Sequence, residues 1–132
     1  MTSHTPPATG TFDIALRPLP EERAAADTRG RMTFTKTWHG ELAGTSDGEM
    51  LTAGTPALGA AGYVALERFE GTLAGRRGSF VLQHSGTMLA GRDDLLVVVS
   101  PGSGTGELAG IAGTLRIDSA GGHRYTFDYA LP

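Results

Sequence analysis

The segment GYVALERFEGTLAGRRGSFVLQHSG, residues 62–86, indicates the fold of this chain more clearly than any other stretch. Apolar and aromatic residues alternate with polar ones on both sides of a glycine-containing centre, which is the pattern of two antiparallel strands joined by a tight turn. If Gly75-Arg76 forms a two-residue type II′ turn, Glu67 lies directly opposite His84. A shift of one residue would move the apolar side chains to the other face. The segment therefore predicts a hairpin with one mainly apolar face and one mixed polar face.

The same alternation recurs along the chain and predicts eight strands. Their ranges are roughly 11–17, 31–43, 49–54, 62–74, 78–90, 94–100, 105–117 and 123–131. Turn signals separate most of them, for example at residues 44–48, and a loop at residues 120–122 places Leu115 opposite Phe127. Residues 20–27 have helical composition but are too few to be stable as a helix on their own, so we expect one helical turn there, inside the loop between the first two strands. Short sequential connections favour a closed eight-stranded antiparallel meander barrel, which has no exposed edge, and a two-sheet β-sandwich is the alternative.

Composition limits the classes of function. The length of 132 residues predicts one domain, which we place at residues 11–132 after a disordered tail at residues 1–10. A net charge of −3 with scattered basic residues gives no reason to expect nucleic-acid binding. No apolar run approaches the ~20 residues of a membrane helix, so we expect no membrane partner. The absence of cysteine excludes disulfides and thiolate chemistry and fits a cytoplasmic location.

Several short motifs match known sites only in part. Gly104-x-Gly106-x-x-Ala109 resembles a dinucleotide fingerprint, but glycines and a period-two pattern follow it where a helix is required. His39-x-Glu41 resembles the start of a zinc deaminase site, which also needs a pair of cysteines. The other histidines show no close ligand spacing, and no serine lies in a nucleophile elbow. We therefore expect neither a cofactor nor a bound metal.

Four blocks of sequence resemble a known family. They are KTWHGELAGT at 36–45, GYVALERFEGTL at 62–73, GSFVLQHSG at 78–86 and PGSGTGELAG at 101–110. Together they resemble a bacterial family of proteins of unknown function whose fold is an allene oxide cyclase-like β-barrel. The resemblance covers nearly the whole chain after the N-terminal tail and implies this barrel. It implies no particular activity, and no catalytic residue of allene oxide cyclase itself can be aligned with a residue of this sequence.

Polar side chains interrupt the apolar faces that we assign to the barrel interior. These residues are Lys36, Tyr63, Glu67, His84, Glu107, Tyr125 and Tyr129. Charged groups are rarely buried unless they are paired. Two explanations are therefore open: the polar groups form an internal network that fixes the strand register, or they line a ligand cavity. A barrel of eight strands is wide enough to be filled by side chains or to hold one small ligand.

These features predict a barrel that binds a small apolar or aromatic molecule. If it is a cyclase or isomerase, Glu67 would be the base or electrostatic stabiliser and His84 would orient it or carry the proton. The ligand-binding residues would be Lys36, Trp38, Tyr63, Phe69, Phe80, Glu107, Tyr125 and Tyr129. The alternatives are a non-catalytic ligand-binding or carrier module and a structural barrel that is packed solid. Outward Val64, Leu66 and Val81 form an apolar patch and predict association into a homo-oligomer.

Overall fold

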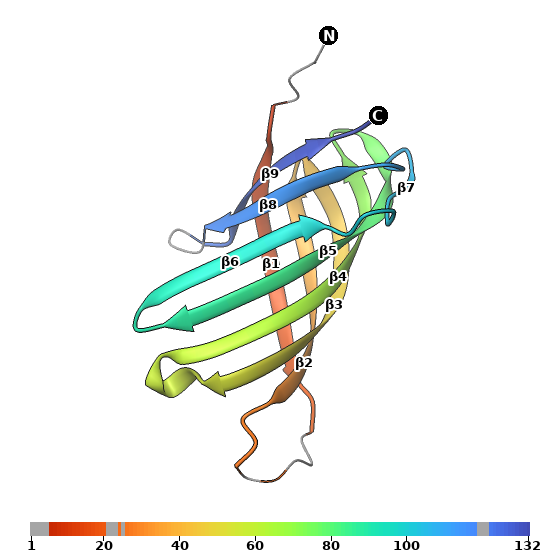
Figure 1. The fold of residues 1–132 in the computed structure, drawn as a ribbon. Helices are drawn as coiled ribbons and strands as arrows, with labels where there is room; N and C mark the ends of the chain where they lie inside the picture. The colour runs from red at the N-terminus through yellow and green to blue at the C-terminus, as the bar shows by residue number, and fades with distance from the viewer. Residues whose placement is uncertain (1–5, 21–23, 25, 119–121) are drawn as a thin grey trace.

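The computed structural model describes residues 6–20, 24, 26–118 and 122–132. Eight antiparallel strands form a closed barrel, and one short strand, β7, lies outside it (Figure 1). The elements are β1 (Ala8–Pro18), β2 (Gly30–Gly40), β3 (Leu42–Thr55), η1 (Pro56–Leu58), β4 (Ala60–Leu73), β5 (Arg76–Leu89), β6 (Arg92–Val99), β7 (Thr105–Gly106), β8 (Ala112–Asp118) and β9 (Arg124–Ala130). This arrangement confirms the predicted barrel over the alternative sandwich. In the part of the chain that the structure describes, no helix is long and apolar enough to cross a membrane.

The wall of the barrel is not equally closed all the way round. Most neighbouring strands share long runs of backbone pairs, and β1 closes the circle by pairing with β9 from Ala8 to Thr11. In contrast, β6 and β8 are joined by the single pair Val98 and Thr114. Toward the start of β6 these two strands run apart (Figure 1). One end of the barrel is therefore more open than the other.

The first strand begins earlier than predicted. Ala8, Thr9 and Gly10 pair with β9, and the Ala8 side chain is fully buried. The prediction of a disordered tail is therefore wrong for residues 8–10, because paired backbone and a buried methyl group hold them in the sheet. Residues 1–5 of that tail lie outside the described residues.

The β4–β5 hairpin turns one residue earlier than predicted. Ala74 and Gly75 are the central residues, and both have positive φ angles, 49° and 85°, as a type I′ turn requires. As a result Glu67 lies opposite Leu82, and His84 lies opposite Ala65. The register is shifted by two residues, so the predicted direct opposition of Glu67 and His84 is wrong. Because side chains alternate with a period of two, every side chain stays on its predicted face.

The chain between β2 and β3 reverses at residues 40–41 and not at the predicted turn, residues 44–48, which lie inside β3. Tyr125 stabilises this tight reversal from β9. Its hydroxyl accepts a hydrogen bond from Leu42 N at 2.9 Å and donates one to the carbonyl oxygen of His39 at 3.0 Å. Because these hydrogen bonds satisfy the backbone groups at the reversal, the two strands can be joined without a longer turn.

Gly48, which we assigned to that turn, makes room for an aromatic ring. It occupies an inward position of β3, and a Cβ atom there would lie 2.3 Å from Cζ of Phe34. Phe34 is buried against this bare stretch of backbone. Glycine is needed here for close packing on the inner wall and not for a turn.

The predicted strand at residues 105–117 is also interrupted. Only residues 105–106 and 112–118 are strands, and the segment between them turns twice, with hydrogen bonds from Leu108 N to Thr105 O and from Ile111 N to Leu108 O. Leu108 and Ile111 are buried and cover one end of the barrel. The glycines of this segment permit the turns: Gly106 and Gly110 have φ angles of 60° and 79°.

The last hairpin has the predicted register, with Leu115 opposite Phe127 and Asp118 opposite Arg124. Its predicted loop falls largely on residues 119–121, which lie outside the described residues. Half of the predicted helical turn at residues 20–27 also lies outside them. In its described part, Asp27 N donates a hydrogen bond to Ala24 O at 2.8 Å.

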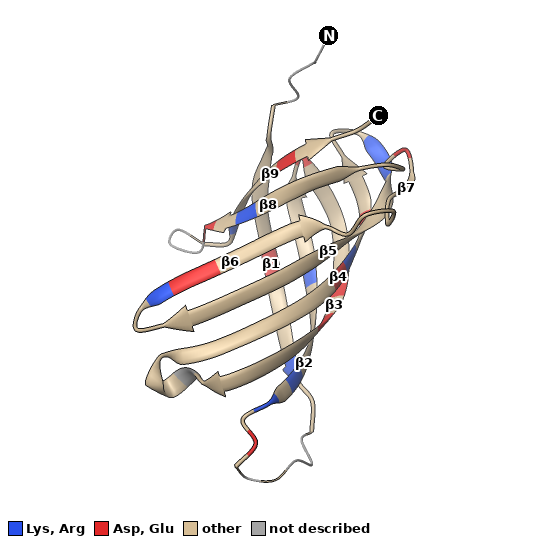
Figure 2. Ribbon diagram, in the orientation of Figure 1, with Lys and Arg blue, Asp and Glu red and all other residues tan. Residues whose placement is uncertain are grey.

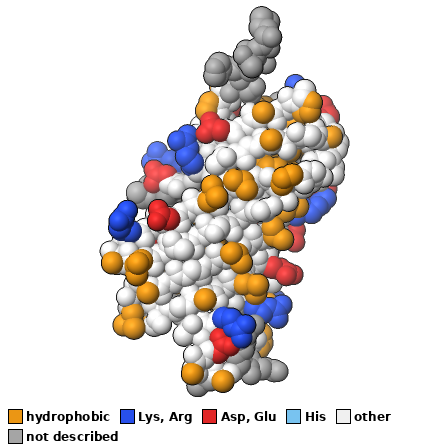
Figure 3. Space-filling model, in the orientation of Figure 1, with side chains coloured by type: hydrophobic (Ala, Val, Ile, Leu, Met, Phe, Trp, Pro, Cys, Tyr) orange, Lys and Arg blue, Asp and Glu red, His pale blue; other side chains and the backbone are white. Residues whose placement is uncertain are grey.

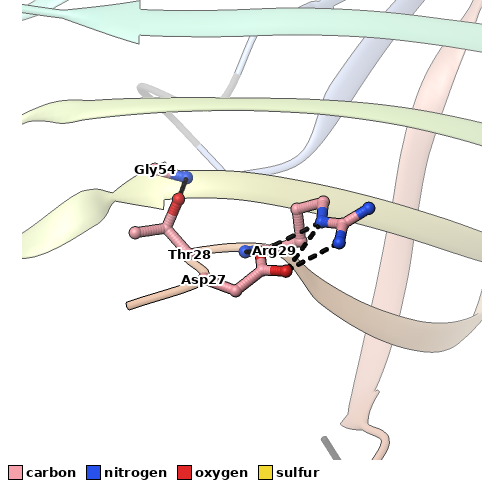
Figure 4. Close-up of polar contacts among 4 residues, drawn as sticks. All are labelled: Asp27, Thr28, Arg29 and Gly54. Carbon is pink, nitrogen blue, oxygen red and sulfur yellow. Dashed lines mark hydrogen bonds and ion pairs between the residues drawn. The ribbon is translucent and has the colours of Figure 1, made fainter. Parts of the chain in front are cut away.

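The connection between β1 and β2 is attached to the end of β3 (Figure 4). Arg29 forms an ion pair with Asp27 at 2.6 Å, and Gly54 N donates a hydrogen bond to Oγ1 of Thr28 at 3.2 Å. These contacts secure the connection beside the tip of the β3–β4 hairpin.

The core fills the more closed half of the barrel with aromatic rings. The centroids of Phe69 and Phe80 lie 5.1 Å apart, and Phe80 lies 5.6 Å from Phe127. Trp38 meets Phe69 edge to face at 6.2 Å. All four rings are at most 2% exposed. Rings at these spacings are in direct contact, so this half of the interior is packed with side chains.

Candidate functional site

Four polar side chains meet inside the barrel beside the aromatic core. Lys36, Ser46, Glu67 and His84 occupy inward positions on β2, β3, β4 and β5 and are between 0% and 6% exposed. We call these four residues the buried polar cluster. Three of them were expected inside from the sequence, and the structure brings them together.

Glu67 is the acceptor at the centre of the buried polar cluster. Its Oε1 accepts hydrogen bonds from Lys36 Nζ at 3.0 Å and from His84 Nε2 at 2.7 Å. Its Oε2 accepts a hydrogen bond from Ser46 Oγ. Ser46 Oγ in turn accepts a hydrogen bond from Nε1 of Trp38 at 3.0 Å. His84 can donate to an ionised carboxylate only with its proton on Nε2.

The Lys36 ammonium is surrounded by aromatic rings as well as paired with Glu67. Its Nζ lies 4.7 Å from the ring centroid of Phe12, 5.3 Å from that of Phe34 and 5.1 Å from that of Trp38. The negative faces of aromatic rings attract a cation at these distances. The rings and the carboxylate together replace the water that the ammonium loses on burial.

Burial and pairing oppose each other in the protonation of the cluster. Burial by itself would raise the pKa of Glu67. The hydrogen bonds from His84 and Ser46 and the charge of Lys36 lower it by more than burial raises it, so the pKa lies below its usual value. Burial lowers the pKa of Lys36 despite the opposing effect of Glu67. Burial, together with the charge of Glu67, raises the pKa of Tyr63. The carboxylate of Glu67 is therefore held in its ionised form.

The lowered pKa of Glu67 predicts a loss of stability in acid. The unfolded chain binds a proton at Glu67 near pH 4.3, and the folded chain binds it only at lower pH. The ionised carboxylate therefore makes its full contribution to the free energy of unfolding above about pH 4.3. This contribution is lost as the pH falls through the pKa that Glu67 has in the folded chain. Urea unfolding at neutral pH and at several acidic pH values should show this fall. In Glu67→Gln the free energy of unfolding should fall less steeply across that pH range. An unchanged slope would show that Glu67 is not the group responsible for the loss in acid.

The geometry of Glu67 leaves it little freedom to act on a substrate. The residue is fully buried, and three donors already contact its two oxygens. A general base needs a free lone pair within hydrogen-bonding distance of the substrate proton. Among the described residues there is also no group of three or more His, Asp or Glu side chains that could hold a metal ion. The arrangement is that of an internal hydrogen-bond network centred on Glu67.

The more open end of the barrel holds a pocket of about 380 Å³ between β3, β4, β5 and β6. Most of its lining residues occupy inward positions, among them Thr52, Tyr63, Gly86, Met88 and Leu95. We call this the mouth pocket. Tyr63 lies across the bare backbone of Gly86, because a Cβ atom at Gly86 would be 2.4 Å from Cε1 of the Tyr63 ring. On β4, Tyr63, Ala65 and Glu67 are successive inward residues, so Ala65 separates the mouth pocket from the buried polar cluster.

The remaining predicted ligand-binding residues lie elsewhere. Trp38, Phe69, Phe80 and Tyr125 are buried in the core and contact neighbouring side chains or backbone groups. Tyr129 is partly buried, with its ring centroid 5.5 Å from that of Phe127. Glu107 was expected inside but is exposed, because it lies in the turn after β7, where its Oε1 accepts a hydrogen bond from Arg77 N. Of the predicted set, only Tyr63 lines the mouth pocket.

Sequence reasoning missed three kinds of residue at these sites. Ser46 was assigned to a turn, although a buried tryptophan needs an acceptor for its indole N–H. Phe34 was assigned to the inner face but not to the surroundings of Lys36. Met88 and Leu95 continue the inward rows that pass through buried His84 and Val97, and that alternation was the signal for the mouth pocket.

Comparison with known proteins places the chain in a family. A search of curated proteins finds no match. A solved structure of a protein of unknown function from the DUF3224 family of Shewanella oneidensis MR-1 is similar over 98% of both chains, with 44% sequence identity and a TM-score of 0.89. The family model described as "Protein of unknown function (DUF3224)" matches residues 8–129. The chain therefore belongs to the DUF3224 family.

Proposed function

We propose that this protein binds a small apolar or aromatic molecule in the mouth pocket. The observation that carries the proposal is a pocket of about 380 Å³ on inward positions of the barrel, beside an interior half that is otherwise packed. Ligand sites are usually concave, mostly apolar and roughly 300–1,000 Å³ in volume. An aromatic ring (Tyr63), a thioether (Met88) and an aliphatic side chain (Leu95) supply such a surface, and Asp93 and Asp94 also line the pocket.

The residues around the mouth pocket suit a rigid base with an adaptable rim. Met32, Met50 and Met88 occupy inward positions toward this end and are each partly buried. Methionine side chains are flexible and polarisable, and they adapt to ligands of different shape. The buried polar cluster supplies the rigid base, since its hydrogen bonds fix the positions of β2, β3, β4 and β5 relative to one another.

Non-catalytic binding or carriage is better supported than catalysis. A cyclase or isomerase that used Glu67 as a base would have to bring substrate past Ala65 to a fully buried carboxylate that already accepts three hydrogen bonds. Nothing at the mouth pocket requires such a movement for binding alone. A bacterial origin is consistent with the Shewanella relative, and a cytoplasmic location goes with this proposal because a chain without cysteine needs no oxidising compartment to fold.

The proposal predicts that a charged side chain in the mouth pocket abolishes binding. Leu95→Arg places a guanidinium among Tyr63 and Met88, where an apolar ligand would have to displace or desolvate it. The probe is N-phenyl-1-naphthylamine, a neutral aromatic dye whose fluorescence rises in apolar surroundings. Titration should give saturable binding to the wild type and a loss of at least about tenfold in affinity for the variant.

The matched control is Leu96→Arg. Leu96 is the next residue of β6, is 57% exposed and points to the outer face, whereas Leu95 is 42% exposed and points inward. The two variants have the same composition and charge, so only the face differs. Equal binding of the dye to Leu95→Arg and to the wild type would refute the mouth pocket as its site, and no saturable binding to the wild type would count against the proposed function.

A further inference from the structure

The wall of the mouth pocket carries negative charge. Asp93 and Asp94 follow Arg92 at the start of β6, where they form a red segment (Figure 2), and both line the pocket. Asp93 lies two residues before Leu95 and directly opposite Met88, so it belongs to the inward row of these side chains. None of the lining residues, all of which the structure describes, is a lysine, arginine or histidine. The pocket therefore presents carboxylate oxygens and no basic group.

No basic side chain in the described part of the chain forms an ion pair with Asp93. Arg92 is its neighbour in sequence but occupies an outward position of β6. The connection between β1 and β2 reaches the edge of the pocket at Gly54, and its guanidinium group, that of Arg29, is already bound by Asp27 at 2.6 Å (Figure 4). Within these residues, the charge of Asp93 is available to a ligand.

The carboxylate of Asp93 stands beside groups that suit the apolar body of a ligand. Tyr63, Met88 and Leu95 line the same pocket from β4, β5 and β6. In the space-filling view, hydrophobic side chains gather at the end of the molecule where β6 begins, with charged side chains beside them (Figure 3). An aromatic face attracts a cation as well as an apolar group, and a thioether is polarisable. The pocket is therefore complementary to a molecule that has both a hydrophobic body and a positive charge.

From these observations we infer that the ligand of the mouth pocket is a small organic cation, an aromatic or aliphatic amine. Its ammonium group pairs with Asp93, and its apolar body packs on Tyr63 and Met88. The inference rests on the proposed binding function and adds the charge of the ligand to it. An anion of the same shape would meet two like charges, at Asp93 and Asp94, and is rejected. Because Asp93 is exposed, its pair with an ammonium stays partly solvated and should favour the cation by about fivefold.

The test compares three naphthalene ligands of similar shape by isothermal titration calorimetry. They are 1-naphthylmethylamine, which is a cation at neutral pH, the neutral 1-naphthylmethanol and the anion 1-naphthylacetate. At low ionic strength the wild type should bind the amine about fivefold more tightly than the alcohol, and the acetate more weakly than either. High salt should reduce this preference, because it screens exposed charges. Asp93→Asn should bind the amine and the alcohol with equal affinity.

Asp47→Asn is the matched control. It removes the same charge, but Asp47 is exposed at an outward position of β3 and does not line the mouth pocket, so the preference for the amine should remain. Leu95→Arg should lose the amine together with the dye. The inference is supported if the preference for the amine is present in the wild type and in Asp47→Asn and is lost in Asp93→Asn.

Three results would overturn the inference: a wild type that binds the alcohol as tightly as the amine or does not bind the amine, a preference that survives Asp93→Asn, and amine binding that survives Leu95→Arg. The dye N-phenyl-1-naphthylamine is neutral and tests the proposed function separately. Saturable binding of the dye without a preference for the amine rejects only the charge of the ligand. Failure of the dye and of all three naphthalene ligands to bind counts against the proposed function as well.

Discussion

Glu67→Gln should lower the free energy of unfolding by about 3–5 kcal/mol, the cost of removing one partner from a buried ion pair. The amide cannot balance the charge of Lys36, which is 4% exposed and has no other carboxylate among its contacts in the described part of the chain. Glutamine also replaces one of the two carboxylate oxygens with an N–H₂ donor, although both oxygens of Glu67 accept hydrogen bonds from neighbouring side chains. Urea unfolding at neutral pH measures the effect.

Two further variants separate this effect from the general cost of the substitution. Glu70→Gln changes the same residue type on the same strand, but Glu70 is exposed and pairs with Arg68 on the surface, so it should lose far less stability than Glu67→Gln. Lys36→Met combined with Glu67→Gln leaves no unpaired charge among the aromatic rings and should recover a large part of the stability. A recovery of this kind would assign the loss to charge rather than to packing.

The outcome also bears on function. If Glu67→Gln unfolds more easily but still binds the dye when folded, the buried polar cluster is structural and the mouth pocket acts without it. If the variant keeps its stability and loses binding, the cluster belongs to the ligand site and the structural interpretation is wrong. Binding measured below the unfolding transition distinguishes these results.

The contact between Glu67 and His84 could be predicted from the sequence, although its geometry could not. The period of two in residues 62–86 places both side chains on the apolar face whichever two-residue turn is chosen. The choice between turns at residues 74–75 and 75–76 depends on whether Ala74 adopts a positive φ angle, which its residue type does not favour. The hydrogen bond forms nevertheless, because long side chains can span diagonal positions of neighbouring strands.

The glycines of β3 explain why other parts of the site were not predicted. Gly44 and Gly48 bracket polar residues, and such a pattern usually marks a turn. Here it marks an inner wall that accepts the Phe34 ring, a long-range contact that local sequence does not encode. Because residues 44–48 were assigned to a turn, the prediction also failed to place Ser46 in the barrel interior. The mouth pocket depends on where β6 and β8 separate, and the sequence of neither strand indicates how far they pair.

Ser46→Ala should also destabilise the fold strongly, although only one hydroxyl is lost. Ser46 Oγ links Nε1 of Trp38 to Oε2 of Glu67, so alanine leaves a buried donor and a buried acceptor without this partner. An unsatisfied buried polar group costs about 1–3 kcal/mol, so the variant should lose roughly 2–4 kcal/mol of unfolding free energy. Trp38 is the only tryptophan of the chain, so its fluorescence emission reports the broken hydrogen bond directly.

Thr45→Ala is the matched control for this experiment. Thr45 precedes Ser46 on β3 and loses a hydroxyl together with a methyl group, but it is exposed on the outer face, so its unfolding free energy should change by no more than about 1 kcal/mol. Ser46→Ala combined with Glu67→Gln should cost less than the sum of the two single variants, because both remove parts of one network. Equal stability of Ser46→Ala and Thr45→Ala, with unchanged tryptophan emission, would show that the hydrogen bonds from Trp38 through Ser46 to Glu67 contribute nothing to the fold.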